Sequence, residues 1–133
     1  MDKVAWVLIR DGKLLVARNR GRDLFYMPGG RPEPEESHAD TLVREVMEEL
    51  GVRILPHTLR HVVDVTAARD AAPGLVRMAC YRAEHHGDLA PANEIVELGW
   101  FTPADYGRVT RAEQQVIDLL VADGQMVGGS GLP

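Results

Sequence analysis

Apolar runs separated by turn-forming residues make up the N-terminal part of the sequence. Residues 4–9 are almost continuously apolar, an Asp-Gly pair follows at 11–12, and residues 14–17 are apolar again. An Asp-Gly pair between two such runs is typical of a β-hairpin closed by a type I′ turn. Another run at 25–27 leads into Pro-Gly-Gly at 28–30, where we expect a strand to end because proline lacks a backbone N–H and glycine favours turns.

The spacing of apolar residues changes to that of a helix after Ser37. The residues that would share one helix face are Ala39, Leu42, Val43, Val46 and Leu50. Ser37 and Asp40 resemble a capping box at the start of this helix, and Gly51 favours its end. We therefore predict a helix between Ser37 and Gly51.

Beyond Gly51 the pattern predicts mainly strands. Runs at 52–65 and 75–83 are strand-like, the loop between them is expected at 67–74, and a short strand is expected around 98–101. These strands and the preceding hairpin are enough for one sheet-based core.

A second amphipathic helix is predicted at 112–122. Val116, Leu119 and Leu120 would form its apolar side, with Glu113 and Asp118 elsewhere on its surface. Because the sequence has neither a repeat nor an internal linker, we expect a single domain at 1–127, followed by a flexible tail at 128–133.

Composition narrows the functional classes. Twenty acidic and fifteen basic residues give a net charge of −5, the wrong sign for binding duplex nucleic acid through its phosphates. With Cys80 as the only cysteine, neither an internal disulfide nor a cysteine-based zinc site can form. No apolar run is long enough to span a bilayer and the N-terminus does not resemble a signal peptide, so we expect a cytoplasmic protein that does not bind membranes.

Three glutamates on the first predicted helix are the main candidates for chemistry. Glu45, Glu48 and Glu49 fall at i, i+3 and i+4, so their side chains share one face beside the apolar stripe. A solvated acidic surface is the ordinary explanation of such a cluster. The alternative is a divalent cation with oxygen ligands, which would offset the repulsion between the carboxylates.

The spacing around these acids favours the second interpretation. From residue 30 to 52 the chain reads Gly-x₅-Glu-x₇-Arg-Glu-Val-x-Glu-Glu-x-Gly-Val, which resembles the Nudix box with every fixed position filled. The resemblance implies an α+β Nudix fold, an α/β/α sandwich with a mixed central β-sheet. It also implies Mg²⁺-dependent, or Mn²⁺-dependent, hydrolysis of a phosphoanhydride bond in a nucleoside diphosphate linked to another group X.

The same resemblance suggests roles for individual residues. Glu45, Glu48 and Glu49 would bind the metal together with Gly30, and one of the carboxylates would accept a proton from the attacking water. Arg44 would orient a carboxylate, and its position four residues before Glu48 allows an i,i+4 pair. The remaining fixed positions of the box, which support its shape, are Gly30, Glu36 and Gly51.

One position next to the box departs from the family pattern. Family members generally have Gly-Glu where this chain has Glu35-Glu36, and two prolines precede the pair. This departure affects the loop before the helix and leaves the proposed metal ligands intact.

Candidates outside the box rest on weaker signals. Glu94, in the loop before the last predicted strand, could supply a further catalytic acid, as in many family members. Four arginines near the box could contact phosphates: Arg18, Arg20, Arg22 and Arg31. Residues that could stack on a base are Trp6, Phe25, Tyr26 and Met78. Solvated arginines, and aromatic and methionine side chains in the core, are the alternatives.

The substrate is less constrained than the reaction. The ADP-ribose and dinucleoside polyphosphate subfamilies carry a proline or a tyrosine about sixteen residues after the box, where this chain reads Ala-Ala-Arg-Asp at 67–70. By elimination we expect a nucleoside triphosphate, hydrolysed to a monophosphate and pyrophosphate. Hydrolysis of ADP-ribose, nucleotide sugars or dinucleoside polyphosphates, or nucleotide sensing without turnover, are the alternatives. A small-molecule nucleotide is the expected partner, and a homodimer is possible.

Overall fold

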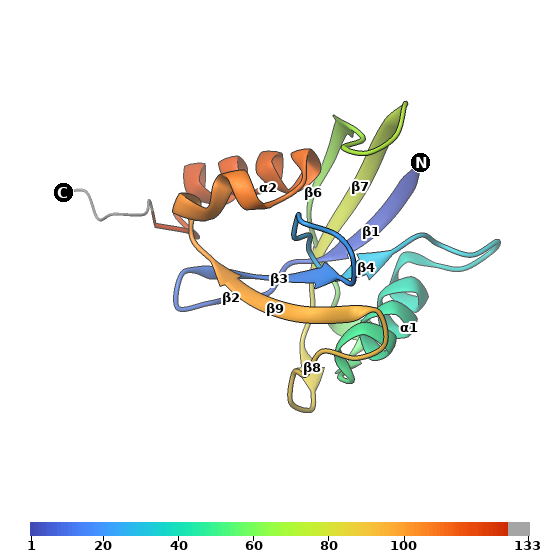
Figure 1. The fold of residues 1–133 in the computed structure, drawn as a ribbon. Coiled ribbons are helices and arrows are strands. Elements are labelled where there is room, and N and C mark those ends of the chain that lie inside the picture. The colour runs from blue at the N-terminus through green and yellow to red at the C-terminus, as the bar shows by residue number, and fades with distance from the viewer. Residues whose placement is uncertain (128–133) are drawn as a thin grey trace.

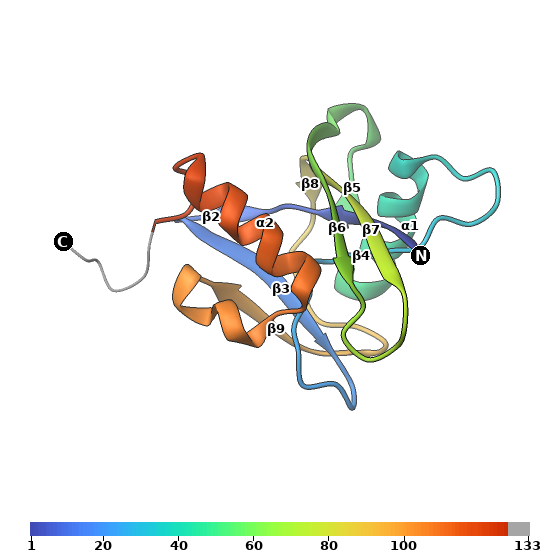
Figure 2. The same ribbon diagram turned by 90° about the horizontal axis from the view of Figure 1, so that it is seen from above.

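The computed structural model describes residues 1–127, so the predicted tail at 128–133 lies outside the described residues. Two helices and nine strands are joined by short loops and two 3₁₀ turns (Figures 1 and 2). In chain order they are β1 (Asp2–Trp6), β2 (Ile9–Arg10), β3 (Lys13–Asn19), β4 (Gly29–Gly30), α1 (His38–Leu50), β5 (Arg53–Ile54), η1 (Pro56–Thr58), β6 (Arg60–Ala68), β7 (Leu75–Arg82), β8 (His85–His86), β9 (Ile95–Phe101), η2 (Pro103–Arg108) and α2 (Arg111–Ala122).

The strands form a mixed sheet structure. One sheet has the order β4-β1-β7-β6, in which β1 and β7 are parallel and the other neighbours are antiparallel. A second sheet has the order β2-β3-β9, and β5 pairs with β8. The helices lie on opposite sides of these strands (Figures 1 and 2), so the expected α/β/α sandwich with a mixed sheet is confirmed.

The first apolar run is divided between the two larger sheets. The type I′ turn is confirmed, since Asp11 and Gly12 have φ of 55° and 75° and connect β2 to β3. The chain leaves β1 at Trp6, however, and enters the second sheet only at Ile9. The prediction of one uninterrupted strand at 4–9 was therefore wrong, because each half of the run finds its hydrogen-bond partners in a different sheet.

The glycine pair lies in a strand, which corrects the predicted strand end. Gly29 and Gly30 form β4 and pair with Ala5 and Val4 of β1. Gly29 has φ of 146°, and a Cβ on it would lie 2.0 Å from the carbonyl oxygen of Val4. The glycine is required for the close approach of two backbones, and the chain does not turn here.

Helix α1 begins and ends where its sequence predicts. The hydroxyl of Ser37 accepts the N–H of Asp40 at 3.0 Å, and Gly51 ends the helix with φ of 69°. The buried face of the helix includes Leu42 and Val46, which pack with Val4 and other apolar residues of one core cluster.

Helix α2 confirms the predicted position, but its buried face differs from the predicted one. Leu119 is 41% exposed, whereas Glu113 is only 1% exposed. The Glu113 carboxylate accepts the backbone N–H of Met27 at 2.9 Å and the hydroxyl of Thr110. This carboxylate is buried because it satisfies a buried N–H that has no partner in the sheet.

Two of the predicted strands have different limits in the structure. The run at 52–65 is interrupted at Pro56, where η1 separates β5 from β6. The last strand starts at Ile95, three residues before the predicted start. Among residues 1–127, no helix has the length and apolar character needed to cross a membrane.

Candidate active site

The three glutamates of α1 lie beside strand β4. The Oε1 atom of Glu49 accepts the backbone N–H of Gly29 at 3.1 Å. Glu45 lies against Gly30, where a Cβ would come within 2.5 Å of its carboxylate carbon. Glu48, one turn along the same face, is exposed. The close packing of helix and glycine strand therefore brings the acids of the box to one edge of the sheet, where two of them meet backbone.

Arg44 is fixed between two carboxylates. Its Nε and Nη2 atoms donate to the two oxygens of Glu36, each at 2.8 Å, and Nη1 donates to Glu45 at 2.5 Å. A fourth hydrogen bond joins Nη2 to the carbonyl oxygen of Arg31 at 3.1 Å. The expected i,i+4 pair with Glu48 is not formed, because the loop before α1 returns Glu36 to within reach of the guanidinium.

Glu36 joins the loop to the helix. Besides binding Arg44, its carboxylate accepts the hydroxyl of buried Thr41 and the backbone N–H of Glu33, both at 2.9 Å. The hydrogen bonds from Arg44 and Glu33 lower the pKa of Glu36 to about 2. Glu35, which replaces the glycine of the family pattern, has φ of 64°. The loop therefore places a non-glycine residue in the left-handed region, which glycine adopts with less strain.

The pKa of Glu49 is raised to about 8, first by burial of its carboxylate and then by the negative charges of Glu45 and Glu48, while the Gly29 N–H and Lys3 act in the opposite direction. Burial and neighbouring negative charge both disfavour the ionised carboxylate. A cation bound beside these acids would favour the ionised form.

The donor set fits a hard divalent cation such as Mg²⁺. The side chains of Glu45, Glu48 and Glu49 offer carboxylate oxygens, which are the ligands that such cations prefer. Gly30 has no side chain and so leaves room for the side chain of Glu45. As placed, no three acidic, histidine or cysteine side chains among residues 1–127 gather closely enough to enclose an ion. Glu45 is turned to Arg44 and Glu49 to Gly29, so binding a cation would require these carboxylates to rotate.

The loop before β9 closes over the C-terminal end of α1. Asn93, in the left-handed region with φ of 53°, donates its side-chain N–H to the carbonyl oxygen of Glu48 at 2.6 Å. The N–H of Ala92 reaches the carbonyl oxygen of Glu49 at 3.0 Å. Glu94 follows directly and is exposed, with its own carbonyl oxygen bonded to the N–H of Arg20. Its expected catalytic role stays a prediction.

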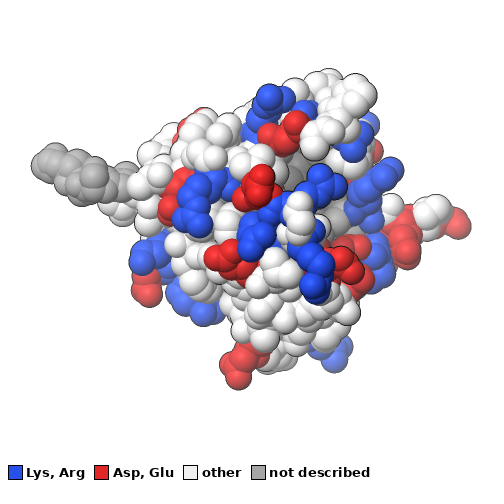
Figure 3. Space-filling model, viewed as in Figure 1, with Lys and Arg blue, Asp and Glu red and all other residues white. Residues whose placement is uncertain are grey.

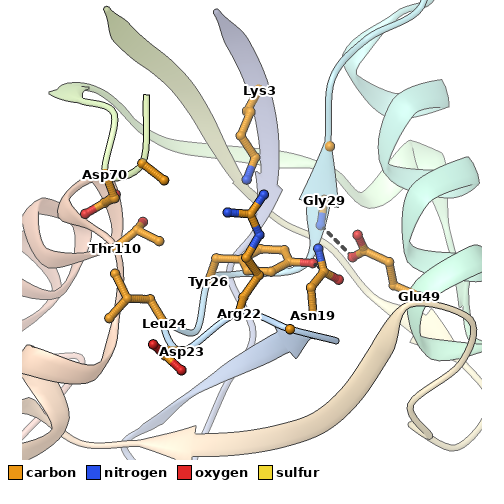
Figure 4. Close-up of a pocket in the computed structure, with 13 residues that line it drawn as sticks. Lys3, Asn19, Arg22, Asp23, Leu24, Tyr26, Gly29, Glu49, Asp70 and Thr110 are labelled. Atoms are coloured by element: carbon orange, nitrogen blue, oxygen red, sulfur yellow. Dashed lines mark hydrogen bonds between the residues drawn. The ribbon is translucent and has the colours of Figure 1, made fainter. Parts of the chain in front are cut away.

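A pocket of about 580 Å³ opens from the edge that carries Glu49, Gly29 and Gly30 (Figure 4). It extends between β1, the loop after β3 and the start of α2. Most of its other side chains are polar or charged: Lys3, Asn19, Arg22, Asp23, Tyr26, Asp70 and Thr110. The phenol of Tyr26 donates to Asn19 at 2.8 Å, which fixes one wall of the pocket.

Of the residues predicted to contact substrate, Arg22 and Tyr26 line this pocket, whereas Phe25, Arg18 and Arg31 do not. Phe25 is buried in the core, with its ring 4.7 Å from that of Phe101. Arg18 pairs with Glu97 at 3.0 Å. Arg31 is exposed, and only its carbonyl oxygen takes part in the site.

The pocket also contains residues that the sequence did not single out. Lys3, Asn19, Asp70 and Thr110 come from four separate parts of the chain. Of these four residues, only Lys3 could have been recognised from the sequence, because a charged residue at the start of an apolar strand usually points away from the core.

The chain is similar to a known domain family and to known proteins. The model of the NUDIX domain matches residues 2–120. The CTP pyrophosphohydrolase of Escherichia coli (strain K12) is 31% identical over 110 residues, which cover 79% of this chain and 78% of that protein. The MutT-like protein of Streptomyces ambofaciens is 31% identical over 121 residues, covering 90% of this chain and 74% of that protein.

Solved structures are similar in fold. The ORF135 protein of E. coli is 29% identical, with a TM-score of 0.73, over 91% of this chain and 88% of that one. The MutT protein of Methanosarcina mazei Go1 is only 18% identical but has a TM-score of 0.75 over 93% and 94% of the two chains. The fold is therefore retained at low sequence identity.

Proposed function

Because this chain belongs to the Nudix hydrolase family and is a pyrophosphohydrolase by that membership, we propose that its substrate is a nucleoside triphosphate. The products would be a nucleoside monophosphate and pyrophosphate, and the divalent cation would be Mg²⁺. The similar E. coli protein named a CTP pyrophosphohydrolase supports a triphosphate substrate.

One observation carries the proposal: the pocket lined by Lys3 and Arg22 reaches the edge of the sheet where the glutamates of α1 lie. Glu49, Gly29 and Gly30 belong to that edge and also line the pocket. A nucleotide whose phosphates met a metal at the acids would therefore have its remaining parts in a pocket with positive charge and hydrogen-bonding groups.

The residues of the site would have different roles in the reaction. Glu45, Glu48 and Glu49 would hold the metal, with Gly30 allowing close approach. When bound, the metal neutralises charge on the phosphates and lowers the pKa of water. Glu36 and Arg44 would position Glu45 through the hydrogen bonds of 2.8 and 2.5 Å. Once rotated to bind the metal, these carboxylates would need no further rearrangement as charge develops in the transition state.

The test is hydrolysis of a panel of nucleoside triphosphates, ADP-ribose, nucleotide sugars and dinucleoside polyphosphates, with products identified by mass. Glu48→Gln should lower kcat by about 100-fold or more, the effect of losing a group that acts in the transition state. Excess EDTA should abolish turnover. Glu84→Gln, an exposed change outside the site, serves as the control.

The products decide between the candidates. Monophosphate and pyrophosphate from a triphosphate support the proposal. Faster turnover of ADP-ribose, a nucleotide sugar or a dinucleoside polyphosphate would replace the proposed substrate and keep the site. Full activity of Glu48→Gln, or activity that survives EDTA, would contradict the proposed metal site.

A further inference from the structure

Two positively charged side chains from distant parts of the sequence line the pocket. Lys3 extends from β1, and Arg22 comes from the loop that follows β3. Figure 4 shows the Lys3 ammonium and the Arg22 guanidinium pointing toward one another, and both side chains line the pocket next to Glu49. They also line a smaller adjoining cavity of about 230 Å³. Like charges repel at short range, so this arrangement needs an explanation.

Within residues 1–127, neither cation has a carboxylate partner at salt-bridge distance. Lys3 is half-buried and lies 4.8 Å from the centroid of the Tyr26 ring. The two other acids of the pocket do not neutralise the pair: Asp70 accepts the backbone N–H of Arg111, and Asp23 forms no ion pair. Basic side chains surround a hollow on this face of the molecule, with acidic side chains among them (Figure 3).

The backbone under both cations is fixed. Lys3 is held in β1 between β4 and β7. The N–H of Arg22 donates to the carbonyl oxygen of Asn19 at 3.1 Å, and its own carbonyl oxygen accepts Nη1 of Arg18 at 2.9 Å. The side chains therefore meet because the fold places them there, and binding an anion between them would require little ordering of the backbone.

We propose that Lys3 and Arg22 are specificity-determining residues that bind the anionic oxygens of the group X. They would select substrates in which X is a phosphate group, as in a nucleoside triphosphate, over substrates in which X is an uncharged sugar. This inference rests on the proposed function, because the pocket meets the acids at Glu49. It assigns Arg18 a positioning role through the Arg22 carbonyl group.

The experiment compares Lys3→Met and Arg22→Met with the wild-type protein on a nucleoside triphosphate and on ADP-ribose. Loss of one charge-assisted hydrogen bond should raise KM for the triphosphate by about tenfold or more. KM for ADP-ribose should change by less than about threefold, an effect below 1 kcal/mol. Lys3→Arg keeps the charge and should restore most of the affinity. Lys13→Met and Arg53→Met, both exposed and outside the pocket, are the matched controls.

A second measurement does not depend on turnover. Calorimetric binding of inorganic triphosphate to the wild-type protein in EDTA should weaken by about tenfold in Lys3→Met and in Arg22→Met. Unchanged triphosphate binding, or equal KM changes for both substrates, would overturn the inference. If the wild-type protein hydrolysed no compound but the variants still lost triphosphate binding, the proposed function would fail and the anion site would stand.

Discussion

Adding one methyl group at Gly30 should lower the activity of the protein without unfolding it. In Gly30→Ala the added methyl group would lie 2.5 Å from the Glu45 carboxylate carbon, a flexible side-chain end that can move away. We expect kcat to fall by about 100-fold because a ligand of the metal is displaced, while the fold survives. Steady-state kinetics and the melting temperature Tm measure the two effects.

Two other glycines serve as references. Gly107→Ala adds a methyl group with nothing within 4 Å and should change neither activity nor Tm appreciably. Gly29→Ala would direct a Cβ into the Val4 carbonyl oxygen and should destabilise the protein strongly. Equal activities of Gly30→Ala and Gly107→Ala would show that Glu45 does not need its place beside β4.

Glu36 should give the stability of the protein a pH dependence in the acid range. Its folded pKa is lowered to about 2 from an ordinary value of 4.5, so the ionised form binds Arg44 only in the folded state. The resulting stabilisation is fully present above pH 4.5 and is lost as the pH falls from 4.5 towards 2. We therefore expect Glu36→Gln to have a lower Tm than the wild type at pH 7, with the difference shrinking below pH 4.5.

Thermal melts of both proteins between pH 2 and 8 measure this effect. Glu33→Gln is the matched control, because Glu33 lies 3.6 Å from Arg44 but is largely exposed. A difference in Tm between Glu36→Gln and wild type that is constant across the whole range would exclude the titration of Glu36 as its cause.

Short-range spacing explains what the sequence predicted of these residues. Glu45, Glu48 and Glu49 share a face because helix geometry fixes i, i+3 and i+4 neighbours. The partner of Arg44 could not be predicted in the same way, since Glu36 reaches it only through the path of an irregular loop. Lys3 was missed because its role depends on a pocket formed by residues that lie far apart in the chain.

Among the helices and strands, α2 contains a buried carboxylate, that of Glu113, whose role in stability can be tested by substitution. Glu113→Ala would leave the buried N–H of Met27 without an acceptor and should lower the free energy of unfolding by about 2–3 kcal/mol. Glu113→Gln keeps one acceptor and should lose less. Urea unfolding measures both, with Asp118→Ala on the exposed side of the same helix as the control. A loss no larger than that of Asp118→Ala would contradict the role of Glu113.

Local sequence patterns predicted where most helices and strands lie, but not which other parts of the chain they contact. The ends of α1 and the turn at Asp11 and Gly12 follow from residues within a few positions, and all were confirmed. The glycine strand β4 depends on contacts with residues 24 and 26 positions away in sequence, and the buried Glu113 on a contact 86 positions away. Composition favours a turn at Gly-Gly and a surface position for glutamate, and tertiary contacts override both preferences here.

For the molecule as a whole, the strands separate two apolar clusters that should melt together. Leu42 of α1 belongs to one cluster and Leu120 of α2 to the other. Strand β1 contributes Val4 and Trp6 to the first cluster and Ala5 to the second. Leu42→Ala and Leu120→Ala should each lower the free energy of unfolding by about 2–5 kcal/mol. Since one strand serves both clusters, unfolding should remain a single transition in each variant.

Tryptophan fluorescence and far-UV circular dichroism, followed through the same urea titration, check this expectation. Leu119→Ala is the control, because Leu119 is 41% exposed. Separate midpoints for the two signals would show that the clusters unfold independently. The homodimer expected from the sequence stays a prediction.

The parallel pairing of β1 with β7 has a consequence for how the chain is made. Lys3 lies opposite Met78 in the register of these strands, so during synthesis β1 is paired only with the short strand β4 until β7 has been made. Until then one edge of β1 is unpaired, and the sheet beside the pocket is incomplete. Nascent chains that end before β7 should therefore be the forms most dependent on chaperones, and ligand binding should begin only after the start of α2, which adjoins the pocket at Thr110, has been made.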